Sequence, residues 1–174
     1  MGVRNCKDIG DNLQRIVMRL MENRNLVKLL YYTDKDPLNH DFSEIVGEGQ
    51  KYKTYSEFCQ NEIFEKLIKI VPRVGPKETS NSILALQITG GHRSLDNGEF
   101  KELSMIIESF VPMTQWIIKS ESLRPFLILG EIQESLCGKT VNGLGKLDGG
   151  DFDVNFLTDE ISCYEQEFSL ISYD

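Results

Sequence analysis

The sequence is poor in the residues that build most catalytic and metal centres. Its 174 residues include two histidines, one tryptophan and four cysteines, and no C-x-x-C pair occurs. Neither His40 nor His92 has a His or Cys at ligand spacing, which argues against a metal site. The scattered cysteines are typical of cytosolic thiols and not of a disulfide framework.

Long apolar stretches are also missing. No run approaches the roughly 18 apolar residues of a membrane-spanning helix, and the N-terminal segment lacks the apolar core of a signal peptide. We therefore expect a protein with neither a membrane partner nor an export signal. With 40% hydrophobic and 26% charged residues, the chain has the composition of a globular protein, and its length predicts a single domain over residues 1–174.

Basic residues are absent from residues 148–174 of the chain. Residues 1–87 carry a net charge of +1 and residues 88–174 a net charge of −9, which together give −8. Eight of the acids lie between Asp148 and Asp174, where no Lys or Arg occurs. Any surface that this segment builds must be strongly negative, so we do not expect a protein that grips a nucleic-acid backbone.

Nucleotide-binding motifs are incomplete. Gly138-Lys139-Thr140 matches the end of a phosphate loop, but Gln133 stands where that motif needs its first glycine. The glycine-rich segment 143–150 lacks the third glycine of a dinucleotide fingerprint, and no βαβ unit surrounds it. We interpret the first as a helix stop and the second as a connecting loop.

The acids do not form a calcium loop. An EF-hand loop beginning at Asp151 would need Gly at its sixth position and Glu at its twelfth, where this sequence has Phe156 and Ser162. Weak cation binding by Asp153 and Asn155 is an alternative to a solvated strand face, which we favour. We predict no enzyme, no cofactor and no metal; a small ligand-binding or enzymatic domain stays as the remote alternative.

Hydrophobic periodicity predicts the main elements. Residues 11–31 have helical spacing, with a break near Asn23 and a shorter second piece that ends at Tyr31–Tyr32. Strands are expected at 67–74, 82–89 and 103–111, a helix at 122–136, and strands at 152–157 and 162–172, the last two joined by a turn at 158–160. The order α-β-β-β-α-β-β predicts an α+β fold with a mainly antiparallel sheet, an N-terminal helix and a second helix packed on the sheet.

A long polar segment at about 38–62 interrupts this pattern. We expect a loop with one short helix near 55–60. Loops of this length in compact domains usually have a function or are covered by a partner.

Several sequence segments resemble segments of small virion proteins of long-tailed bacteriophages, and the resemblance covers most of the chain. They are NLVKLLYYTDKDPL (25–38), KLIKIVPRVG (66–75), SILALQIT (82–89), LSMIIESFVPMTQWIIK (103–119), SLRPFLILGEIQESLCGKTVNGLGKLDGGDF (122–152) and ISCYEQEFSLISYD (161–174). The order of segments resembles the tail terminator fold, from which the segment at 38–62 departs.

The resemblance implies a virion structural protein that is assembled in the host cytoplasm. A tail terminator forms a ring, typically a hexamer, that caps the tail tube and joins it to the head–tail connector. The nearest alternative is a head-side stopper or another neck or collar protein. Contact with a sheath or collar is a further expectation for the segment at 38–62. The family has no catalytic motif that could be transferred to this chain.

Such a ring surrounds DNA that must slide through it without specific binding. An acidic lumen repels phosphate, whereas a basic lumen would retain it. We therefore predict that the acidic C-terminal hairpin lines or faces the channel; the alternative is an ordinary solvated acidic face. The candidate channel residues are Asp148, Asp151, Asp153, Asp159, Glu160, Glu165 and Glu167.

Overall fold

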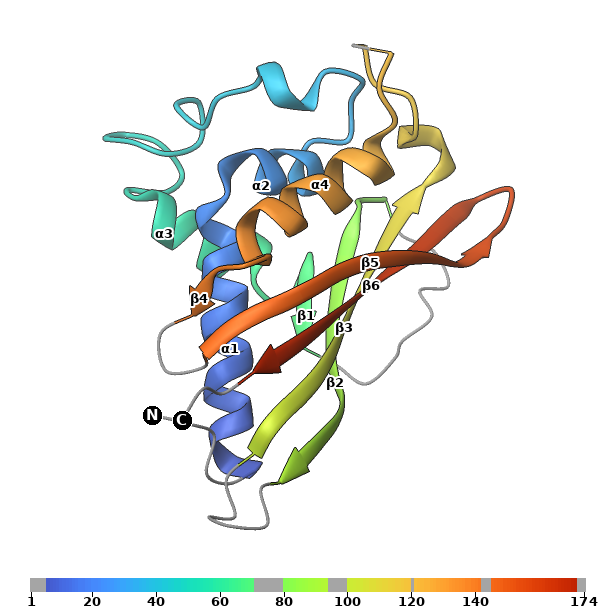
Figure 1. Ribbon diagram of the computed structural model, residues 1–174. Coiled ribbons are helices and arrows are strands. Elements are labelled where there is room, and N and C mark those ends of the chain that lie inside the picture. Colours follow the sequence, from blue (N-terminus) through green and yellow to red (C-terminus); the bar gives the residue numbers. More distant parts are fainter. Residues whose placement is uncertain (1–5, 71–79, 94–99, 120, 142–144, 172–174) are drawn as a thin grey trace.

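The computed structural model describes residues 6–70, 80–93, 100–119, 121–141 and 145–171 (Figure 1). Within these ranges the α-helices are α1 (Cys6–Glu22), α2 (Arg24–Tyr31), α3 (Tyr55–Phe58) and α4 (Arg124–Leu136). Three short turns of helix are η1 (Pro37–Asn39), η2 (Cys59–Ile63, a π-helix) and η3 (Met113–Gln115). The strands are β1 (Ile68–Ile70), β2 (Ile83–Arg93), β3 (Phe100–Pro112), β4 (Thr140–Val141), β5 (Gly145–Leu157) and β6 (Ile161–Ile171).

The strands of the described residues form one sheet in the order β1-β2-β3-β6-β5-β4. β1 pairs with β2 in parallel, and all other neighbouring pairs are antiparallel. The predicted α+β fold with a mainly antiparallel sheet is therefore confirmed, with the short β4 added to the predicted order.

The N-terminal helical region has two parts, as its sequence predicts. α1 begins at Cys6, earlier than the expected start at residue 11, and ends at Glu22. Asn23 then caps α2, because its side chain accepts a hydrogen bond from the backbone N–H of Leu26 at 3.1 Å. The cap satisfies one of the free amides at the start of α2 and sets the bend between the two helices.

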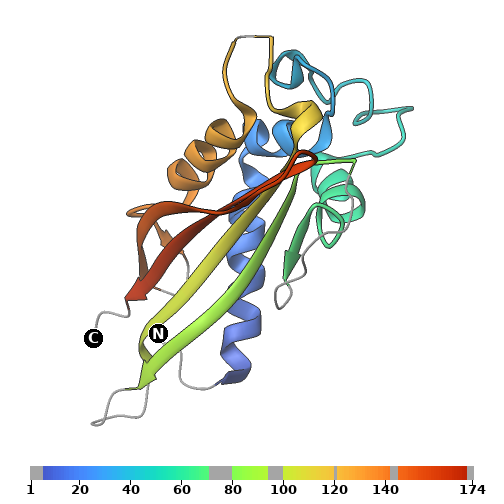
Figure 2. The ribbon, with the colours of Figure 1, turned by 90° about the vertical axis from the view of Figure 1, so that its right-hand side faces the viewer.

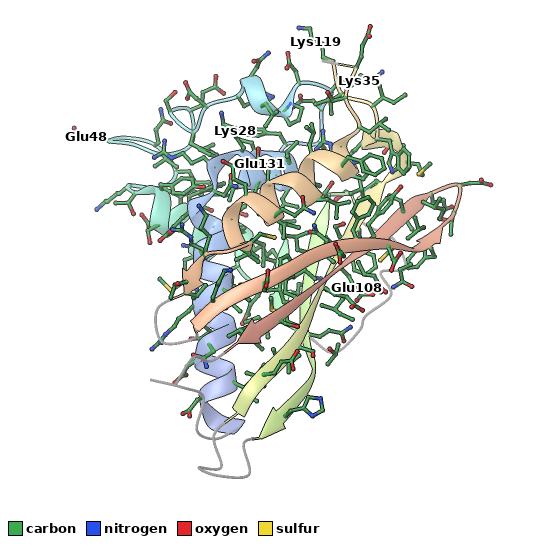
Figure 3. The ribbon with its side chains drawn as sticks, viewed as in Figure 1. Lys28, Lys35, Glu48, Glu108, Lys119 and Glu131 are labelled. Carbon is green, nitrogen blue, oxygen red and sulfur yellow. The ribbon has the colours of Figure 1, made fainter. Side chains whose placement is uncertain are left out.

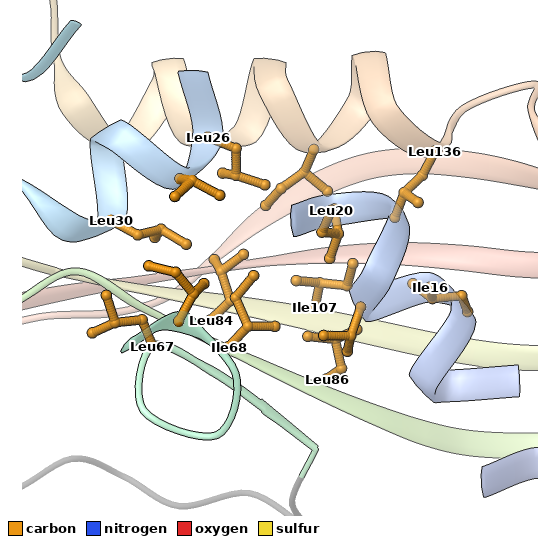
Figure 4. Packing of buried hydrophobic residues seen from close by; sticks show 14 of the residues in the cluster. Ile16, Leu20, Leu26, Leu30, Leu67, Ile68, Leu84, Leu86, Ile107 and Leu136 are labelled. Carbon is orange, nitrogen blue, oxygen red and sulfur yellow. The ribbon is translucent and has the colours of Figure 1, made fainter. Parts of the chain in front are cut away.

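The core lies between the helices and one face of the sheet (Figure 4). α1 contributes Ile16 and Leu20, which pack near Leu86 of β2 and Ile107 of β3. Figure 2 shows the strands in front of α1, with α4 at the left and α3 at the right. Among the described residues, the helices thus cover one sheet face, and the other face is formed by the strands.

The prediction of a loop at 143–150 is wrong for residues 145–150. β5 begins at Gly145 and pairs with β6 from Lys146 onward, while β4 pairs with its first residues. Glycines at 149 and 150 suggested a turn, but here they form a β-bulge inside the strand. A Cβ at Gly149 would lie 2.6 Å from the carbonyl oxygen of Glu167, so glycine permits the close approach of β6.

The first strand also differs from its predicted bounds. The strand expected at 67–74 is observed at Ile68–Ile70, and residues 71–74 lie outside the described residues. The hairpin of β5 and β6 is confirmed, with its turn at 158–160. In the part of the chain that the structure describes, no helix is long and apolar enough to cross a membrane.

The segment at 38–62 contains the short helix that was expected near 55–60. Thr54 caps α3 by accepting a hydrogen bond from the backbone N–H of Glu57 at 3.2 Å. The segment packs inward through Phe42, Tyr52 and Phe58, which are buried in the main core. It therefore has a hydrophobic anchor of its own.

Candidate functional site

The sheet face opposite the helices carries most of the candidate acids. On β6, Gln166 points toward α4, because its side-chain amide donates to the carbonyl of Leu129 at 3.3 Å. Glu165 and Glu167, which alternate with Gln166, therefore point away from the helices. Their partners on β5 are Asp153 and Asp151, so these four carboxylates share one face.

Asp148 extends the same face along β5, where it lies opposite Ser169. Five of the seven predicted residues thus come together; we call this surface the acidic face and define it by Asp148, Asp151, Asp153, Glu165 and Glu167. All five are exposed or half-buried. None of the groups that surround them on β5 or β6 between residues 147 and 170 is a Lys or Arg.

Asp159 and Glu160 lie apart from the acidic face. They occupy the β5–β6 turn, where the hydroxyl oxygen of Thr158 accepts from the backbone N–H groups of Glu160 and Ile161 at 3.2 and 3.0 Å. The side chains are exposed at the hairpin tip. The structure therefore separates these two candidates from the other five.

A residue that the sequence reasoning missed completes the acidic face. Glu108 of β3 lies directly opposite Glu165 of β6, and it is buried (Figure 3). Its Oε1 accepts a hydrogen bond from the side-chain amide of Asn155 at 2.8 Å. The signal in the sequence was a charged residue inside the mostly apolar stretch 105–111, because a charge at such a position is costly unless it is satisfied.

Like charges therefore face each other across strands. Glu108, Glu165 and Asp153 form one row over three neighbouring strands, and Glu167 with Asp151 forms a second row. Directly opposed like charges destabilise a sheet by some tenths of a kcal/mol to about 1 kcal/mol per pair. The fold tolerates this repulsion and concentrates negative potential on one surface.

A hollow of about 370 Å³ opens on this face. Its walls include hydroxyl groups of Thr89, Ser104 and Ser169 and the carboxylates of Asp151 and Glu167. Among the described residues, no group of three His, Cys, Asp or Glu side chains has the arrangement of a metal site. The lining of the hollow also includes the apolar residues Met105, Ile106 and Phe168, so polar and acidic side chains border an apolar part.

A second polar arrangement holds the segment at 38–62. Lys51 and Lys66 approach the two carboxylate oxygens of Glu62 at 2.6 and 2.9 Å, and the hydroxyl of Tyr52 also donates to Glu62. These hydrogen bonds, with that of Lys51 the largest, lower the pKa of Glu62 to about 2. These contacts tie the middle of the segment, at Lys51 and Tyr52, to Glu62 near its C-terminal end.

Arg124 joins the end of α2 and the loop that follows it to the start of α4. It is fully buried, and its guanidinium donates to the carbonyls of Leu29 and Tyr32 at 2.9 and 2.6 Å, to that of Gln115 at 3.0 Å, and to that of Asp34. Burial lowers the pKa of Arg124 to about 10. The residue satisfies carbonyls at the end of α2 and in the loop that follows, which is a structural role.

The loop after α2 and the connection before α4 meet near Lys35 and Lys119 (Figure 3). The ammonium of Lys119 lies 3.2 Å from a carboxylate oxygen of Asp36, and the backbone N–H of Lys119 donates to the carbonyl of Lys35 at 2.6 Å. On the other side of α2, the amide of Asn23 donates to the carboxylate of Glu131 at 2.8 Å. The Asn23 contact holds the start of α2 against α4, and the Lys119 contacts hold the loop after α2 against the connection before α4.

Comparison with known proteins supplies a relationship to phages. No curated protein sequence matches this chain. The sequence model of the YomW family matches residues 23–166, from the cap of α2 to the middle of β6. The family takes its name from a protein derived from the Bacillus phage SPBc2. The matched region covers most of the chain, and this protein therefore belongs to the phage-associated YomW family.

Proposed function

We propose that this protein is a virion structural protein that forms the tail terminator ring of a long-tailed phage. The ring has six copies, caps the tail tube and joins it to the head–tail connector. Membership of the YomW family supports a phage origin. The α+β order of segments supports the terminator over other neck proteins.

The observation that carries the proposal furthest is the acidic face. Five carboxylates on two adjacent strands point away from the helices with no basic side chain between them. A ring that turns this face toward its lumen repels the phosphates of passing DNA and binds none of them. The protein then acts as a collar around DNA, with no catalytic step and no cofactor.

The proposal is tested with purified tail tubes that lack this protein. Added protein is expected to cap one end of each tube in negative-stain images, and a reconstruction of the virion neck should show the chain between tube and connector. Binding to isolated head connectors but not to tubes would identify the head-side stopper instead. Binding to neither would overturn a role in the neck.

The acidic lumen has a test of its own. Neutralisation of four carboxylates (Asp151→Asn, Asp153→Asn, Glu165→Gln and Glu167→Gln) should leave capping intact and slow the passage of DNA. Assembled particles would be triggered to release DNA, and the release rate measured at several salt concentrations. Equal rates for the variant and the original protein at low salt would show that the face does not line the channel.

A further inference from the structure

We draw no further inference here: the strongest candidate, the exposed apolar patch that Phe126 of α4 forms with Phe152 and Val154 of β5, carries none because nothing in the structure shows what covers it.

Discussion

At the scale of single residues, two side chains decide how the helical end of the molecule holds together. Arg124 donates to four backbone carbonyls from a fully buried position. Glu62 receives two lysines and a tyrosine from the segment at 38–62 and its flank. Neither role was predicted from the sequence, because Arg124 begins a helix and Glu62 lies in a polar segment, and hydrophobic periodicity does not reveal burial at either position.

Substitution of Arg124 should be costly. Arg124→Met keeps much of the side-chain volume but leaves several carbonyls without a donor, and each buried unsatisfied group costs about 1–3 kcal/mol. We expect the free energy of unfolding to fall by roughly 3 kcal/mol or more, measured by urea denaturation. Lys119→Met is the control: its side chain is 74% exposed, and its loss should change stability by less than about 1 kcal/mol.

The ion pairs of Glu62 predict a pH dependence. Because the pKa is lowered in the folded state from its ordinary 4.5 to about 2, the stabilisation is present above pH 4.5 and disappears as the pH falls toward 2. Glu62→Gln should cost roughly 1–2 kcal/mol at neutral pH, since both lysines are exposed. Thermal melts of both proteins should converge between pH 4.5 and 2; a constant difference over that range would contradict the assignment.

At the scale of elements, β5 shows how tertiary pairing overrides a local signal. Two adjacent glycines at 149 and 150 predicted a loop, as glycine pairs usually do. The antiparallel pairing with β6 instead absorbs them in a bulge. Alternating residues located the second half of the strand, but its first half is recognised only when β6 is placed beside it.

The two kinds of glycine in this chain give a matched pair of substitutions. Gly149 has a φ of +112°, and a Cβ there would lie 2.6 Å from the carbonyl oxygen of Glu167. Gly149→Ala should therefore destabilise the protein by roughly 1–3 kcal/mol. Gly130 lies within α4 with open space around its Cα, so Gly130→Ala should stabilise it by about 0.5–1 kcal/mol. Chemical denaturation of both variants tests the sign of each effect.

At the scale of the whole molecule, the charge asymmetry of the sequence becomes a surface. The net −9 of residues 88–174 could be counted from the sequence, and strand alternation predicted that acids would share a face. Sequence could not show that β3 would lie beside β6 and add Glu108, because strands far apart in the chain choose their neighbours through tertiary packing. The sequence-based prediction also placed Asp159 and Glu160 with the other five acids, whereas in the structure these two residues lie apart, in the β5–β6 turn.

Repulsion across the acidic face predicts that the fold is less stable than it could be. Asp151→Asn and Asp153→Asn each remove a like-charge pair with β6, so each should raise the free energy of unfolding by about 0.2–1 kcal/mol. Added salt should stabilise the original protein more than the double variant, because screening weakens exposed repulsion. Melting curves at roughly 20 and roughly 500 mM salt measure the difference. If the variants are instead less stable than the original protein, the paired carboxylates do not repel each other.

The place of β6 in the sheet has a consequence for biosynthesis. This strand comes latest in the described chain, yet it lies between β3 and β5 and joins the two halves of the sheet. While the ribosome is still making it, β3 and β5 have no common neighbour, and the helices emerge with apolar faces that no complete sheet can cover. Folding must therefore wait for translation to pass the hairpin, and stalled or prematurely released chains should be preferred targets of chaperones and proteases.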